Sequence, residues 1–322
     1  MSNFTDFFPS GGAGGGGGGA IPDLVGLEYL ILSGGGAGAG SPGATYGGGG
    51  GGGGTLLNDY FYANKDTTIP VVVGAGGAYS ATITIPGGNS EIGLDVNKVT
   101  ILGGGGGTYN GTPTTGGTCL GGRGVTAGTG NTPGDMGYGF NQKGKQLGRL
   151  SDTAVIVADA YINQTTEAHL NGLVIGRSGG GAAGLGGPGV STGNWQTGGT
   201  GGIGLDPTTV TSSFLTQAEL QTELIGEVTT GISYIGGGGT GYGQTATNPR
   251  ANPPGGCGRD TVNALPNTGG GGGGLSSGGS GFTMIRVLTS QSVTTTGTPS
   301  TYTQGAYTIY VWKNTGSIII NS

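Results

Sequence analysis

The chain has little charge and few of the side chains that carry chemistry. Of its 322 residues, 8% are charged, two are cysteine and one is histidine. One histidine leaves almost no material for a zinc cluster or a Ser-His-Asp triad. The 16 acidic residues are scattered singly, without the spacing of a calcium-binding loop. We therefore expect no enzyme, no bound metal and no cofactor.

The same scarcity bears on partners and location. A net charge of −5 disfavours a nucleic-acid partner. No apolar run approaches the 18 residues of a membrane-spanning helix, and residues 1–9 lack the basic and apolar regions of a signal peptide. The two cysteines, Cys119 and Cys257, allow either a single bridge or two reduced thiols, and manufacture in a cytosol favours the thiols.

Glycine, by contrast, makes up 85 of the residues. Unpatterned glycine at this level indicates disorder, but disordered chains are poor in the aromatic and β-branched residues that are frequent here. An apolar run also leads directly into a glycine tract in four places. These runs are residues 27–32, 99–102, 173–176 and 232–235. A fifth tract, residues 269–274, precedes the apolar run 282–287. Flexible linkers need no such coupling, so we predict that the glycine is ordered.

Ordering this much glycine is energetically demanding. Fixing the backbone costs on the order of 100 kcal/mol for these residues, and they bury no side chains in return. Left-handed three-residue helices of the polyproline-II type point their N–H and C=O groups outward, and without Cβ atoms they can pack side by side and bond laterally. The sequence therefore predicts a mainly β fold with a polyglycine-II-type helix lattice, arranged as a glycine-rich sandwich with at most one short α-helix.

Three regions follow from the composition. Residues 1–20 are expected to be a stub and glycine linker, either an anchor that attaches through Phe4, Phe7 and Phe8 or a frayed terminus. Residues 21–288 form the glycine-rich domain, with variable loops at about 110–170 and 188–230. Residues 289–322 form a linker and a terminal β-hairpin, with strands at 307–312 and 317–321 around a turn at 313–316.

Local patterns predict further elements. Strands are expected at residues 25–32, 68–73, 79–85 and 154–157. A capping box formed by Thr216 and Glu219 predicts one short helix that stops at Gly226.

Several aromatic residues stand between glycines. Exposed on a stiff framework, they would be suited to stacking on sugars or gripping a receptor, whereas the alternative role is to cap and pack the glycine helices. Trp195 is the strongest candidate for recognition because its neighbours are polar. The candidate receptor-binding residues are Trp195, Tyr138, Phe140 and Tyr109.

The junctions of strand and glycine tract carry a resemblance. Residues 99–107, 278–287 and 307–318 resemble the glycine-rich structural proteins of marine bacteriophages. More distantly, glycine tracts alternating with variable loops are similar to the tip adhesins of T-even-type phages, whose glycine helices form a sandwich that displays receptor-binding loops. Those adhesins lack the N-terminal stub and terminal hairpin expected here.

The resemblance implies a non-enzymatic virion protein of a bacteriophage, a tail-fibre or fibre-tip element involved in host attachment. It implies other virion proteins and a host glycan or outer-membrane receptor as partners, and synthesis in the host cytoplasm. A homo-oligomer such as a trimer is expected, without insertion into a membrane. The alternative is a purely architectural glycine-rich protein, a capsid decoration or extracellular filament that binds no receptor.

Overall fold

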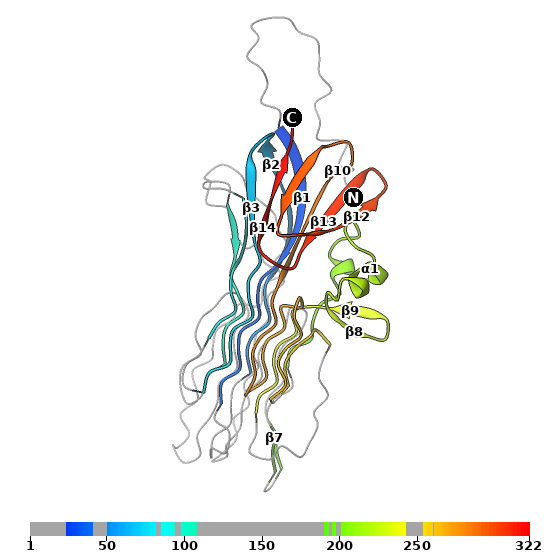
Figure 1. The fold of residues 1–322 in the computed structure, drawn as a ribbon. Helices are drawn as coiled ribbons and strands as arrows, with labels where there is room; N and C mark the ends of the chain where they lie inside the picture. Colours follow the sequence, from blue (N-terminus) through cyan, green and yellow to red (C-terminus); the bar gives the residue numbers. More distant parts are fainter. Residues whose placement is uncertain are drawn as a thin grey trace, which may run out of the picture.

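Two stacked antiparallel sheets form one end of the molecule, and glycine tracts that continue from their strands form the other (Figure 1). The computed structural model describes residues 24–40, 50–81, 85–93, 98–107, 190–192, 195–197, 201–242, 254–259 and 261–322. The mainly β architecture expected from the sequence is confirmed.

The first sheet has the strand order β12-β13-β10-β1-β2. These strands are β12 (Ser300–Gln304), β13 (Tyr307–Trp312), β10 (Phe282–Leu288), β1 (Leu24–Leu32) and β2 (Leu56–Asn64). The second sheet has the order β11-β14-β3-β4-β5. These strands are β11 (Val293–Thr296), β14 (Gly316–Ile320), β3 (Thr68–Val72), β4 (Ser90–Ile92) and β5 (Val99–Ile101).

Smaller elements lie outside the two sheets. They are the hairpin of β6 (Val190–Thr192) and β7 (Trp195–Thr197), the hairpin of β8 (Glu227–Thr229) and β9 (Ile232–Tyr234), the 3-10 helix η3 (Pro207–Thr209) and the helix α1 (Gln217–Thr222). The predicted capping box is confirmed, because Thr216 and Glu219 each bond the other's backbone N–H.

Alternating side chains of β1 fill the core between the sheets. Leu27, Tyr29 and Ile31 are buried there against strands of the second sheet. The intervening Leu30 and Leu32 are buried on the opposite face, where residues 205–235 cover the first sheet with Phe214, Leu220 and Ile225 among others. The strand predicted over 25–32 is thus confirmed, and it is buried on both faces where it approaches the glycine tract.

The predicted terminal hairpin is wrong in its pairing. β13 and β14 exist close to the expected positions, but β13 pairs with β10 and β12 whereas β14 pairs with β11 and β3. The turn between them crosses from one sheet to the other. This crossing places Trp312, Ile318 and Ile320 together in the core between the sheets. Local turn chemistry does not distinguish a return within one sheet from a crossing to the facing sheet.

The strand predicted over 79–85 is also wrong where the structure describes it. Residues 79–81 and 85 are not in a strand. Tyr79 lies against the glycine tracts instead: its N–H donates to the Ser277 hydroxyl at 2.9 Å and its hydroxyl donates to the Gly40 carbonyl at 2.6 Å. The strand predicted over 154–157 and the tract following 173–176 lie outside the described residues, whereas the strand over 68–73 is confirmed as β3.

The tract after β1 reveals how the glycines are held. Successive N–H groups of this tract donate to three different neighbouring segments, and residues three apart donate to the same segment. The donor and acceptor pairs are Gly34 to Gly88, Gly35 to Gly279, Gly36 to Gly52, Ala37 to Ile85 and Gly38 to Ser276, all at 2.9–3.1 Å. A period of three is that of a polyproline-II-type helix.

The carbonyl groups of the same tract follow the same period. Those of Gly34 and Ala37 accept from one further tract, and those of Gly35 and Gly36 accept from two others. The donors are Gly104, Gly107, Gly77 and Gly272. The tract at 34–38 therefore has six hydrogen-bonded neighbours, at 50–54, 74–77, 85–88, 103–107, 269–274 and 276–281. This confirms the predicted polyglycine-II-type lattice.

Close approach of these backbones excludes side chains from most positions. A Cβ on Gly36 would come within 3.0 Å of three backbone atoms of Gly104 and Gly105. A Cβ on Gly51 would likewise meet the backbone of Gly36 and Ala37. Real Cβ atoms do not approach backbone so closely, so the lattice requires glycine at these sites.

Two serine hydroxyls join the sheets where they pass into the lattice. Ser33, after β1, donates to the Leu102 carbonyl in the opposite layer at 2.8 Å. Ser90, in β4, donates to the Leu32 carbonyl at 2.8 Å and accepts from the Gly74 N–H at the same distance. Both residues are fully buried. Their hydrogen bonds connect the two layers at the point where the strand pairing of the sheets ends and the glycine lattice begins.

We predict that Gly36→Ala is strongly destabilising. The added methyl must displace the backbone of another tract, so we expect a loss of about 3 kcal/mol or more in the free energy of unfolding. Gly305→Ala is the control, because its Cβ would meet nothing within 4 Å and its φ of +59° costs only about 1 kcal/mol. Thermal unfolding followed by circular dichroism measures both, and similar melting temperatures for the two variants would contradict the lattice.

Candidate functional site

Of the sequence-predicted recognition residues, the structure describes Trp195, which lies at the end of the lattice away from the sheets. Trp195 begins β7, where it pairs with Thr192 of β6, and this hairpin lies beyond the glycine tracts at that end (Figure 1). Tyr109, Tyr138 and Phe140 lie outside the described residues. So do the three predicted anchoring residues, Phe4, Phe7 and Phe8.

The direction of the tracts explains why this end is a candidate site. The tracts after β1 and β5 run parallel, since Gly104 bonds to Gly34 and Gly107 bonds to Ala37. Both lead away from the sheets, and the described residues stop at Gly40 and Gly107. The sequence that follows Gly107 contains the predicted loop at about 110–170. The tract after β5 thus leads away from the sheets toward the predicted variable loop.

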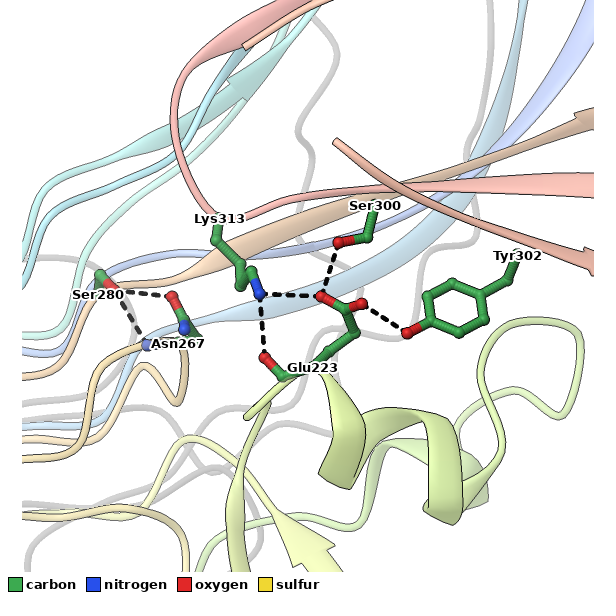
Figure 2. Close-up of polar contacts among 6 residues, drawn as sticks. All are labelled: Glu223, Asn267, Ser280, Ser300, Tyr302 and Lys313. Atoms are coloured by element: carbon green, nitrogen blue, oxygen red, sulfur yellow. Dashed lines mark hydrogen bonds and ion pairs between the residues drawn. The ribbon is translucent and has the colours of Figure 1, made fainter. Parts of the chain in front are cut away.

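Residues 205–235, which we call the module, include part of the variable segment expected at about 188–230 and pack beside the sheets. The module is attached to the first sheet through a buried polar cluster at Glu223, just after α1 (Figure 2). The Glu223 carboxylate accepts from Lys313 Nζ at 2.9 Å, from Ser300 Oγ at 2.9 Å and from the Tyr302 hydroxyl. Lys313 also donates to the Glu223 main-chain carbonyl at 3.2 Å.

These contacts determine the protonation state of the cluster. Burial acts to raise the pKa of Glu223, but hydrogen bonds from Tyr302, Lys313 and Ser300, with the Lys313 charge, lower that pKa overall. Burial and the hydrogen bond to Glu223 raise the pKa of Tyr302 to about 12. At neutral pH the carboxylate is ionised and the tyrosine keeps its proton. Each group is bonded to its partner, so the cluster stabilises the packing of the module against β12 and the end of β13.

Sequence reasoning missed this cluster. Glu223 stands only as a charged residue beside apolar ones near the helix end, and its partners follow 77 to 90 residues later. No local spacing connects them. A signal available in the sequence was the scarcity of charge itself, because a rare carboxylate within an apolar stretch requires a partner.

A second carboxylate occupies a backbone site. Glu227 accepts from the N–H groups of Gly255 and Gly256 at 3.0 and 2.9 Å, and both glycines have positive φ. Consecutive N–H groups of this kind bind anions, and here the protein's own side chain fills the site.

The neighbouring Cys257 is buried, and Cys119, with which the sequence allows a bridge, lies outside the described residues. Burial first, and then the charge of Glu227, raise the pKa of Cys257 to about 12. A thiol with so high a pKa is a poor nucleophile at neutral pH.

Two further properties concern the described residues alone. Among them, no group of three or more His, Cys, Asp and Glu side chains could hold a metal ion. In the same part of the chain, no helix is long and apolar enough to cross a membrane.

We predict that Glu223→Ala loosens the module from the sheet. Removing the carboxylate leaves Lys313 and Tyr302 without their partner in a half-buried site, so we expect a loss of about 2–3 kcal/mol in unfolding free energy. Glu91→Ala is the matched control, since it removes a more exposed pair with Lys98 and should cost less than about 1 kcal/mol. Chemical denaturation measures the free energy of unfolding of both variants. Equal losses in the two would show that the Glu223 cluster does not hold the module on the sheet.

The contribution of Glu223 should also depend on pH. Its pKa in the folded protein lies below the ordinary 4.5, so as pH falls the unfolded chain takes up the proton first. The stabilisation is complete above pH 4.5 and is lost as pH falls through the lowered folded value. The difference in unfolding free energy between wild type and Glu223→Gln should narrow only below pH 4.5. A difference that narrows between pH 7 and 5 would contradict this assignment.

Comparison with known proteins identifies one family for the chain. No curated protein and no solved structure shows significant similarity to the chain. A family described as "Glycine-rich domain" matches residues 20–288, which takes in the glycine tracts, the module at 205–235 and strands of both sheets. The chain therefore belongs to the glycine-rich domain family.

Proposed function

We propose that this chain is a structural virion protein of a bacteriophage, a tail-fibre or fibre-tip element that takes part in host-receptor attachment and catalyses no reaction. One observation carries the proposal: a hydrogen-bonded glycine lattice leads the chain away from a folded sandwich, and the tract after β5 leads on toward the predicted variable loop at about 110–170. Such a lattice holds the bases of loops at fixed positions through backbone bonds. Stiff presentation of loops is the requirement of a particle that must grip a cell surface.

The two ends would serve different partners. At the lattice end, Trp195, Tyr138, Phe140 and Tyr109 would contact a host glycan or an outer-membrane receptor. β1 begins at Leu24 at the sandwich end. Phe4, Phe7 and Phe8, in the sequence that precedes it, would attach the chain to other virion proteins. Assembly as a homo-oligomer, with a trimer as the form common in fibres, would multiply weak receptor contacts. The protein would be made in the host cytoplasm and act outside the cell as part of the particle.

The resemblance to glycine-rich phage proteins supports this reading, and the family match agrees with it in glycine content alone. A purely architectural protein would use the same lattice without a receptor. The two functions differ in whether the isolated protein recognises cells.

Antibody-labelled phage particles test the location. Antibody raised against the purified chain should bind at fibres or fibre tips in negative-stain images of particles that encode it. Purified protein should adsorb to the host cells and slow infection, and Trp195→Ala should weaken adsorption about tenfold relative to the exposed control Val262→Ala. Labelled particles without adsorption would establish the architectural alternative, and unlabelled particles would refute a virion protein altogether.

A further inference from the structure

The outer face of the first sheet is covered only in part. Next to the glycine tracts it carries Leu30, Met284 and Val311, which are buried under the module at 205–235. Farther from the tracts, the strand register places Tyr62 opposite Gly26, and Tyr60 and Arg286 on either side of Glu28. These residues, with Tyr307, form a surface that we call the tyrosine face.

Two tyrosines of β2 are unusually open on this face. Tyr60 is 47% exposed and Tyr62 is 43% exposed. Their ring centroids are 6.1 Å apart and the rings meet edge to face. Gly26, opposite Tyr62, has no side chain to cover that ring. Large aromatic surfaces left in water in this way are characteristic of binding positions.

A fixed ion pair lies in the middle of the face. Arg286 donates to Glu28 at 2.7 Å, and its guanidinium lies over the Tyr307 ring, 3.7 Å from the centroid. The Ser213 hydroxyl of the module donates to the other oxygen of Glu28 at 2.8 Å. The pair is thus held from both sides, which lowers the entropy lost when a ligand binds.

The charge of the face favours a neutral ligand. Among the described outward positions of β12, β13, β10, β1 and β2, only Glu28 and Arg286 are charged, and they cancel. Glu28 would repel an anionic ligand, and Arg286 would repel a cationic ligand. A carboxylate acceptor beside a guanidinium donor instead matches neighbouring hydroxyl groups, which both donate and accept hydrogen bonds.

The spacing favours an extended ligand. Tyr60 and Tyr307 stand on strands separated by β1 and β10. Three inter-strand steps span about 14 Å. A ligand crossing this distance would meet aromatic rings at both ends and the ion pair between them.

We propose that the tyrosine face binds a neutral polysaccharide. The C–H faces of sugar rings stack on Tyr60 and Tyr62, whose ring faces carry partial negative charge, while sugar hydroxyls bond Glu28 and Arg286. This site lies on the sheet, apart from the receptor-binding residues at the lattice end, and does not depend on the virion location proposed above.

Affinity electrophoresis of the full chain tests the proposal. Native gels containing dextran, mannan or soluble starch should retard the wild-type protein with at least one of the three, whereas acidic alginate should not. The double variant Tyr60→Ala/Tyr62→Ala should bind about tenfold or more weakly, because two stacking contacts are lost. The variant Tyr60→Phe/Tyr62→Phe keeps the rings and should stay within about twofold of wild type, as should Val262→Ala.

Three results would overturn it. These are unchanged migration of the wild type in all three neutral gels, retardation by alginate alone, and retardation that survives the double alanine variant. Light scattering after size-exclusion chromatography adds a fourth, since a wild-type dimer that the double variant dissociates would make the face an interface between copies. If the double variant shows a lowered melting temperature, Tyr62→Ala alone takes its place, because that ring faces Gly26.

Discussion

The lateral hydrogen bond between glycine backbones is the interaction on which the rest of this molecule depends. A helix with three residues per turn and no internal bonds directs its N–H and C=O groups toward its neighbours, so it is stable only when neighbours surround it. The tract after β1 meets this need with six of them. Each bond contributes only about 1 kcal/mol net, but the many bonds together offset the large entropy loss of ordering glycine. The same closeness makes a single Cβ intolerable at positions such as Gly36.

The β-sandwich supplies what the lattice lacks. Glycine tracts bury no side chains, whereas the sheets bury an ordinary apolar core between Tyr29, Val71, Trp312 and their neighbours. Because strands and tracts are continuous, the core fixes the order and direction in which tracts enter the lattice. Ser33 and Ser90 then bond across the layers at the junction. Hydrophobic burial thus aligns one end, and backbone hydrogen bonding maintains that alignment along the tracts.

This division leaves recognition chemistry to the places where side chains remain. Glu223 and Cys257 are buried and the half-buried Glu227 is bonded to backbone N–H groups, so these residues serve internal contacts and offer no reactive group to a ligand. Tyr60 and Tyr62, in contrast, are exposed aromatic side chains on the uncovered half of the first sheet. Both proposals, a virion protein that attaches to cells and a sheet face that binds polysaccharide, place binding on the surface. The interior groups are used for internal contacts.

The sequence by itself determined the local conformations. Alternation predicted β1 and β3, the Thr216–Glu219 box predicted α1, and the coupling of apolar runs to glycine predicted the lattice, because each depends on neighbouring residues and on the missing Cβ. Only the tertiary structure decided the partners. β13 and β14 part into different sheets because Trp312 and Ile318 share one core, and residues 79–81 pack on the tracts instead of forming a strand. Glu223 likewise meets Lys313 only after the module docks. Pairings over such separations depend on the burial of the whole chain, which no local pattern contains.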